Sequence, residues 1–233
     1  LKSVLASSFC FIPIFIGFIL PIIELSLWAL ETNVDIFNNK FLVGSFNTIT
    51  LGLFTGLICA LLAIVINFSI RFTKNKFLER LNSLMSIGYA IPGLILAVGI
   101  TRFLVFSDQN VFTNINFVIT GSLVGLFLAY IIKSYALANS SIESGYERIS
   151  NSIDNSAQLL GSSGGKLLGR IHFPLMRTSF LTAVLLVTSE VVKELPATLI
   201  LRPFNFDTLA VITYTYAAEE RMYQAALPSL AIV

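Results

Sequence analysis

The sequence predicts an all-α polytopic membrane protein with about six transmembrane helices. Hydrophobic residues make up 55% of the 233 residues and charged residues only 12%, and the mean hydropathy is +0.83. A soluble domain of this length cannot bury so much apolar surface. Apolar runs of the roughly 20 residues that a helix needs to cross about 30 Å of hydrocarbon recur along the chain. The alternating pattern that is typical of membrane β-barrel strands does not occur.

Six apolar segments follow one another, separated by polar links. They are about Val4 to Leu30, Phe41 to Ile70, Leu81 to Phe106, Phe117 to Leu137, Thr178 to Leu201, and a last one that begins near Met222. We interpret residues 1–233 as one transmembrane domain with a core at 41–233. Because the chain starts at Leu1 and stops in an apolar run, we expect it to be a fragment of a longer protein.

Small residues at intervals of four mark two of these segments. Gly52 and Gly56 lie in the second segment, and Gly121 and Gly125 repeat the spacing in the fourth. Small residues at this spacing allow neighbouring membrane helices to approach closely. We therefore expect helix contacts at both pairs.

The distribution of basic residues predicts the orientation, because Lys and Arg in short loops stay in the cytoplasm. With a cytoplasmic amino terminus, ten of the fifteen basic residues face the cytoplasm: Lys2, four between Arg71 and Arg80, and five between Lys133 and Arg177. The opposite loops are net acidic, with Glu31, Asp35, Asp108, Asp207, Glu219 and Glu220.

The longest polar interval, Ala138 to Arg177, is predicted to form a cytoplasmic helix-turn-helix over residues 139–175. Apolar residues recur every three or four positions from Ile142 to Leu160, as in an amphipathic helix or two short ones in succession. Gly161 can end this helix in a left-handed cap, and Pro174 begins the next apolar segment. An alternative is a helix that lies on the bilayer surface.

The order of residues in this interval resembles the coupling loop of bacterial ABC importer permeases. That family has Glu-Ala-Ala, three residues, Gly, nine residues, Ile, one residue, Leu-Pro. The same spacing occurs here in Asn155-Ser156-Ala157, Gly161, Ile171 and Phe173-Pro174. Asn155, Ser156 and Phe173 depart from the pattern, and the carboxylate of neighbouring Asp154 can substitute for the missing Glu.

The resemblance implies a transport subunit and not an enzyme. In the family this loop docks on a separate ATP-hydrolysing subunit, which implies that ATP binds to a partner and that this chain holds no cofactor. The chain has no Gly-rich phosphate loop of its own. The residues that the resemblance assigns to ATPase coupling are Asp154, Asn155, Ser156, Ala157, Gly161, Ile171 and Pro174.

Charged residues interrupt the fifth apolar segment. Glu190, Lys193 and Glu194 have helical spacing and are predicted to share one face. An ionised group inside a membrane costs at least about 2.5 to 3.5 kcal/mol, so this face should line a pathway or be paired internally. With Pro196 and Thr198 it forms a candidate translocation pathway. The alternatives are a Glu190–Lys193 pair that holds helices together, or a segment near the outer surface.

The sequence after Tyr146 is similar to the carboxy-terminal half of ferric-iron transport permeases in particular. The similarity rests on Lys193 to Thr198, Leu201 to Ala210, Ala218 to Arg221 and Ala225 to Pro228. It implies iron transport across the bacterial inner membrane with an ABC ATPase subunit, a periplasmic substrate-binding protein and a second permease half, in the same polypeptide or a dimer.

Hard oxygen ligands for ferric iron occur at Asp207, Glu219 and Glu220, with Tyr214, Tyr216 and Tyr223 nearby. The favoured alternative is an aromatic interfacial belt with ordinary acidic loops, so no metal site is assigned. His172, the single histidine, is expected to make a packing or headgroup contact. Cys10 and Cys59 are expected to be small packing residues.

Several other functions stay open or are disfavoured. The same architecture can carry thiamine, sulfate or a polyamine, and Glu190, Lys193 and Glu194 can act as the ion relay of a secondary transporter. A membrane enzyme is disfavoured because no paired nucleophile and base is evident. A net charge of +2 does not suggest binding to nucleic acid.

Overall fold

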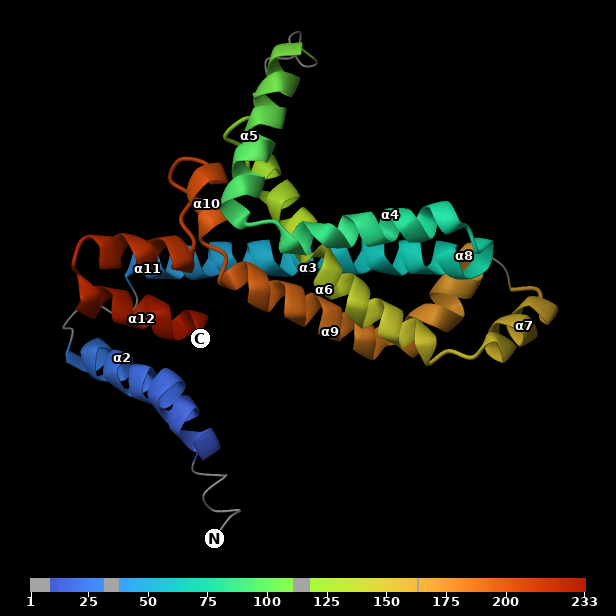
Figure 1. The fold of residues 1–233 in the computed structure, drawn as a ribbon, viewed down its shortest axis with the longest axis horizontal. Coiled ribbons are helices and arrows are strands. Elements are labelled where there is room, and N and C mark those ends of the chain that lie inside the picture. The colour runs from blue at the N-terminus through green and yellow to red at the C-terminus, as the bar shows by residue number, and fades with distance from the viewer. Residues whose placement is uncertain (1–8, 32–37, 111–117, 163) are drawn as a thin grey trace. The chain divides into compact units, whose positions relative to one another are not determined.

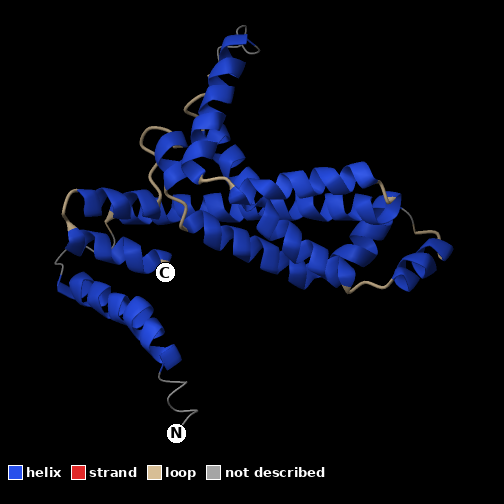
Figure 2. Cartoon of the chain, in the orientation of Figure 1, coloured by secondary structure: helices blue, strands red, loops and turns tan. Residues whose placement is uncertain are grey.

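The computed structural model describes residues 9–31, 38–110, 118–162 and 164–233. Throughout these ranges the regular structure is helical, without a strand (Figure 2). Lys2, Asp35 and the predicted starts of two apolar segments at Val4 and Phe117 lie outside the described residues.

The chain divides into two compact units. The first contains Leu1–Asn47 and Phe206–Val233, and the second contains Thr48–Asn205. The helices of the first unit are η1 (Phe15–Ile19), α2 (Leu20–Glu31), the start of α3 (Asn39–Thr73), α11 (Leu209–Ala218) and α12 (Met222–Ile232). The helices of the second are the rest of α3, α4 (Lys76–Ser86), η2 (Ile87–Ala90), α5 (Gly93–Asn110), α6 (Leu123–Glu147), α7 (Asn151–Leu159), α8 (Gly164–Leu167), η3 (Leu168–His172), α9 (Phe173–Val192) and α10 (Pro196–Leu201).

Four helical stretches in the described ranges are long and apolar enough to cross a membrane. They are Phe9–Glu31, Asn39–Thr73, Leu123–Glu147 and Gly164–Val192. The helices on either side of Pro92 give a fifth span if they are counted as one. Many large apolar side chains on these helices are exposed, Phe46 and Leu185 among them, as expected of surfaces that face lipid.

The predicted span from Leu81 to Phe106 is not one straight helix. Its two parts, Lys76–Ala90 and Gly93–Asn110, meet at an angle of 115°. Ile91 at the bend has an extended backbone, with φ −79° and ψ 126°, because the ring of Pro92 disfavours the helical conformation of the preceding residue. As a result α5 points away from α4 (Figure 1).

The predicted span that ends at Leu137 continues as α6 to Glu147. The polar residues after Leu137 do not end the helix, because they form hydrogen bonds with neighbouring helices. Asn67 of α3 donates to Asn139 Oδ1 at 2.7 Å, and Ser141 donates to the carbonyl of Ser179 in α9 at 3.1 Å.

Helix α9 also begins earlier than predicted. The stretch Gly164–Val192 is one helical run, with a π-turn, η3, at Leu168–His172 immediately before Pro174. Proline lacks the N–H that continues an α-helix, and a π-turn is one way of accommodating it. Pro174 therefore lies inside a longer helix and does not start it.

Glycines set the closest helix contacts of the second unit, in which α6 packs along α9 (Figure 1). A Cβ atom on Gly56 would lie 2.8 Å from the Val184 carbonyl oxygen, and one on Gly52 would lie 2.9 Å from Thr188 Cγ2. The predicted contacts at Gly52 and Gly56 are thus confirmed, between α3 and α9. Gly125 contacts Leu104, whereas the prediction for Gly121 was wrong: it precedes α6, has φ +80°, and its Cβ would meet open space.

The first unit joins residues from both ends of the chain. Trp28 of α2 and Tyr223 of α12 have ring centroids 5.8 Å apart. Asn47 donates to the carbonyl of Asp207, just before α11, at 3.0 Å. An added Cβ at Gly44 would collide with Ile212, so α3 and α11 are closely packed.

Candidate functional site

Helix α7, a turn and helix α8 occupy the polar interval that contains the predicted coupling residues. Gly161 has φ +78°, a conformation that glycine adopts without steric cost. Its N–H bonds to Gln158 O, and the N–H of Ser162 bonds to Ala157 O, both at 2.9 Å. This pair of hydrogen bonds is the Schellman cap of a helix. The left-handed cap predicted at Gly161 is therefore confirmed.

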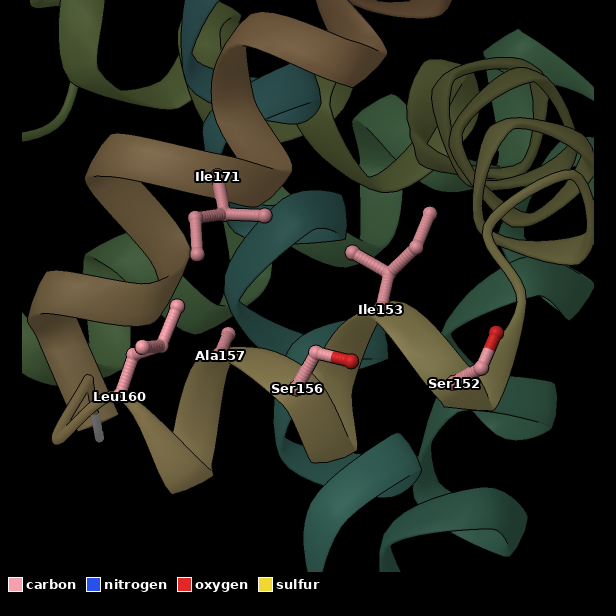
Figure 3. Close-up of a pocket in the computed structure, with 6 residues that line it drawn as sticks. All are labelled: Ser152, Ile153, Ser156, Ala157, Leu160 and Ile171. Carbon is pink, nitrogen blue, oxygen red and sulfur yellow. The ribbon is translucent and has the colours of Figure 1, made fainter.

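The face of α7 away from the other helices is exposed and partly apolar. Leu159 and Leu160 are 88% and 87% exposed, and Asn155 and Ser156 are also exposed. Ala157 is buried beneath them. An open pocket of about 330 Å³ lies between this helix and η3, lined by Ser152, Ile153, Ser156, Ala157, Leu160 and Ile171 (Figure 3).

Asp154 points inward from α7. Its Oδ2 accepts from Arg71 Nε at 2.7 Å, and its Oδ1 lies 2.9 Å from His172 Nε2. Asp154 is 5% exposed. Its carboxylate therefore does not replace the missing Glu of the family pattern on the exposed face, where Asn155 stands. The interaction is internal, between α7 and two other helices.

Arg71, near the end of α3, also reaches the end of α6. Its Nη1 donates to the carbonyl of Tyr146 at 3.1 Å, and its Nη2 donates to that of Ile149 at 2.7 Å. The last carbonyls of a helix have no partner within the helix, and a guanidinium can donate in several directions at once. One side chain therefore joins α3, the end of α6 and α7.

His172 is fully buried, so it cannot make the headgroup contact that was one expectation. Its ring packs among Phe68, Phe72 and Tyr146, with centroid separations of 5.5, 5.9 and 5.5 Å. A carboxylate accepts, so Nε2 carries the hydrogen that faces Asp154. The other nitrogen, Nδ1, is buried without a hydrogen-bond partner among the described residues. We call Arg71, Asp154 and His172 the loop node.

The charged residues of the fifth segment do not all share one helix face. Helix α9 ends at Val192, and the chain turns at Lys193–Leu195 before Pro196 starts α10. Glu190 and Lys193 are 3.9 Å apart, and the Lys193 side chain is 57% exposed. Glu194, beyond the helix end, is instead buried, with 6% of its side chain exposed.

Glu194 pairs with Lys133 of α6 through its Oε2. Its Oε1 accepts from the N–H of Ala197 at 3.4 Å. Thr198 donates to the Glu194 carbonyl at 2.6 Å, so its oxygen accepts from the hydroxyl of Tyr130, also at 2.6 Å. Two sets of contacts thus hold the segment between α9 and α10 against α6. One is the ion pair, and the other is the pair of hydrogen bonds from Tyr130 to Thr198 and from Thr198 to the Glu194 carbonyl.

The bend between α4 and α5 packs against Glu194 and against the α6 backbone next to Lys133. A Cβ atom on Gly93 would collide with Glu194 Oε1, and one on Gly88 would collide with the carbonyl oxygen of Ile132, next to Lys133. Gly88 has to be glycine because the backbone of Ile132 leaves no room for a side chain, and at Gly93 a side chain would displace the Glu194 carboxylate. This explains the sequence Ile87 to Gly93 at the bend.

Sequence reasoning missed Lys133 and Arg71 as members of these sites. Lys133 was counted as a cytoplasmic loop residue, but it lies within α6. Lys133 lies in the apolar part of α6, ten positions before its next charged residue, Glu143. A lysine in such a stretch needs a partner, and that requirement was the available signal. For Arg71 no comparable local signal exists.

The acidic residues considered for iron are dispersed. In the part of the chain that the structure describes, no three His, Cys, Asp or Glu residues lie close enough together to hold a metal ion. Glu219 pairs with Arg221 at 3.0 Å. The ring of Tyr216 lies between two cations, with Lys40 Nζ and the guanidinium carbon of Arg221 5.1 and 4.9 Å from its centroid.

Comparison with known proteins finds a similar transport permease. No protein-family model matches the chain. The Fe(3+)-transport system permease protein FbpB 2 of Haemophilus influenzae is 26% identical over 219 residues, which is 89% of this chain and 40% of the relative. The chain therefore spans less than half the length of that protein. The resemblance that the sequence motifs predicted is confirmed: over most of its length the chain is similar to a ferric-iron transport permease.

Proposed function

We propose that this chain is a transmembrane permease component of an ATP-driven importer. The observation that carries the proposal is helix α7, which presents two almost fully exposed leucines, Leu159 and Leu160, beside an open pocket. Exposed apolar side chains beside a pocket are typical of a protein interaction site. The spacing of residues in this loop matches the ABC permease pattern, and the similarity to a transport permease extends over 89% of the chain.

In this proposal the partner at α7 is a separate ATP-hydrolysing subunit. Asn155, Ser156 and Leu160 contact it, and Ala157 and Ile171 form the floor of the pocket between them. Gly161 and Pro174 act indirectly, by ending α7 and shaping the helical run that follows. The chain lies in the bacterial inner membrane with α7 in the cytoplasm. A periplasmic binding protein and a second permease half complete the importer.

The proposed cargo is ferric iron. Its support is the name of the relative and the local sequence from Lys193 to Thr198. A cation would pass close to the α9–α10 break, where Glu190 is half-exposed and Glu194 is buried. Thiamine, sulfate or a polyamine are the alternative cargoes of the same architecture.

The Lys133–Glu194 pair favours a second candidate, a secondary transporter. A buried carboxylate and ammonium within apolar helices can exchange a proton or an ion during transport. Uptake would then depend on an ion gradient and need no ATPase partner.

Substitutions on two faces of α7 test the proposal. Ser156→Arg places a long cation in the pocket, while Gln158→Arg places the same side chain on the exposed side that does not line it. We expect Ser156→Arg, like deletion of 156–161, to abolish co-purification of the ATPase subunit and ATP-dependent uptake of ferric ion in vesicles. Gln158→Arg should retain both.

Two results would contradict the proposal. Uptake by Ser156→Arg at the unaltered level would show that α7 is not the coupling helix. Uptake driven by a proton gradient in vesicles without ATP would favour the secondary transporter.

A further inference from the structure

The loop node connects three helical segments at one carboxylate, and Arg71 extends it to the end of α6. Asp154 comes from α7, Arg71 from the end of α3, and His172 from the π-turn before α9, and Arg71 also holds two carbonyls at the end of α6. These residues are distant in sequence: Arg71 and Asp154 are 83 positions apart. Apart from the node, α7 makes few contacts with the remaining helices. Three of its exposed side chains, Ser152, Ile153 and Ser156, line an open pocket.

The node is also largely buried. The side chains of Asp154 and Arg71 are 7% and 16% exposed, and that of His172 is 0% exposed. Charge-assisted hydrogen bonds in such surroundings are shorter and stronger than neutral ones. Three aromatic rings enclose the imidazole, so His172 has little room to change rotamer. A displacement of α7 therefore moves Asp154 together with its two partners.

We propose that Arg71 and His172 are positioning residues that transmit movement of α7 to α3 and α9 through Asp154. This inference rests on the proposed function, since it assumes that the ATPase moves α7. In this inference Asp154 transmits the movement, and the exposed residues of α7 contact the ATPase. Arg71 of α3 and His172, which precedes α9, both contact the Asp154 carboxylate. A movement of α7 would therefore reach both long helices together.

The test measures coupling separately from docking. The permease that contains this chain is reconstituted in vesicles with its ATPase and binding protein, and ferric ion taken up is divided by ATP hydrolysed. For Arg71→Gln we expect the ATPase still to co-purify and this ratio to fall about tenfold, within the range typical of coupling between linked sites. Arg148→Gln is the matched control, because Arg148 is an exposed cation close to α7, and its ratio should not change.

Two substitutions of His172 make the test independent of Arg71. His172→Phe keeps a ring in the aromatic surroundings but loses the donor to Asp154, whereas His172→Gln keeps an N–H donor at a similar reach. We expect the ratio to fall for His172→Phe and to be largely retained for His172→Gln. A purely structural role would lower the amount of folded permease and leave uptake per ATP unchanged.

The outcomes separate the two proposals. If the unaltered permease does not bind an ATPase, the proposed function fails. If it binds the ATPase but Arg71→Gln and His172→Phe keep the same uptake per ATP, transmission through the node is refuted. Loss of ATPase co-purification from folded variants would also overturn the inference, since Asp154 would then belong to the docking surface.

Discussion

Lys133 of α6 and Glu194, which follows α9, form a largely buried ion pair although 61 positions separate them. The pair lies where α9 and α10 are interrupted and where the bend at Pro92 meets them through Gly93. Charges in such surroundings are tolerated only when each has a partner. The ion pair thus fixes the position of one chain break and one bend relative to α6.

Removing one member of this pair should destabilise the protein more than removing both. Lys133→Met leaves the Glu194 carboxylate buried and unpaired, which we expect to cost about 3–5 kcal/mol of unfolding free energy. The double variant Lys133→Met with Glu194→Met should recover most of that loss. Reversible unfolding in mixed micelles measures the three free energies. Glu194→Met alone completes the cycle, and a loss in the double variant equal to the sum of the two single losses would show that the two charges do not interact.

Neutralising Glu194 should reduce transport while leaving the ATPase bound. Glu194→Gln keeps the size of the side chain and an acceptor for Ala197, but removes the charge that a passing cation would meet. Uptake of ferric ion by reconstituted vesicles is expected to decrease at least about tenfold, equivalent to about 1.4 kcal/mol. Glu143→Gln is the control, because Glu143 is an exposed carboxylate of α6, ten positions after Lys133 and outside the candidate pathway. Normal uptake by Glu194→Gln would reject a pathway role.

Two glycines of α5 should respond to alanine in opposite directions. The new methyl of Gly93→Ala would collide with Glu194 Oε1, and such overpacking costs about 1–3 kcal/mol. Gly99 lies in the same helix with nothing within 4 Å of an added Cβ, so Gly99→Ala should stabilise the helix by about 0.5–1 kcal/mol. Thermal unfolding in one detergent compares the two variants. A destabilised Gly99→Ala protein would indicate that a partner covers this part of α5.

The sequence predicted the fold to the extent that local patterns encode it. Apolar runs located α3 and most of α6 and α9, and the glycine spacing located the contact between α3 and α9. The pattern of glycine and polar residues also located the end of α7 at Gly161. Each of these features depends on residues within a few turns of one another.

The pairings that define the sites could not be predicted in the same way. The apolar run from Leu81 to Phe106 hides the bend because its composition is uniform, and only Pro92 marks it. Asp154 was expected to face a partner, but its orientation depends on Arg71, which lies in another helix. Helical spacing placed Glu194 on a face with Glu190, whereas α9 ends two residues after Glu190 and the chain then turns to bring Glu194 to Lys133. Tertiary contacts override local periodicity at these positions.

The predicted orientation can be tested with two cysteines on opposite sides of the membrane. Leu160 and Phe204 are 87% and 102% exposed, and positive-inside counting places Leu160 in the cytoplasm and Phe204 outside. Cys10 is exposed and is first replaced by Ala, whereas Cys59 is buried and can stay. In right-side-out vesicles, a membrane-impermeant maleimide should label Phe204→Cys and not Leu160→Cys. In inverted vesicles the pattern should reverse, because the two side chains then exchange access to the reagent. Labelling of both from the same side would contradict the orientation on which docking of a cytoplasmic ATPase at α7 depends.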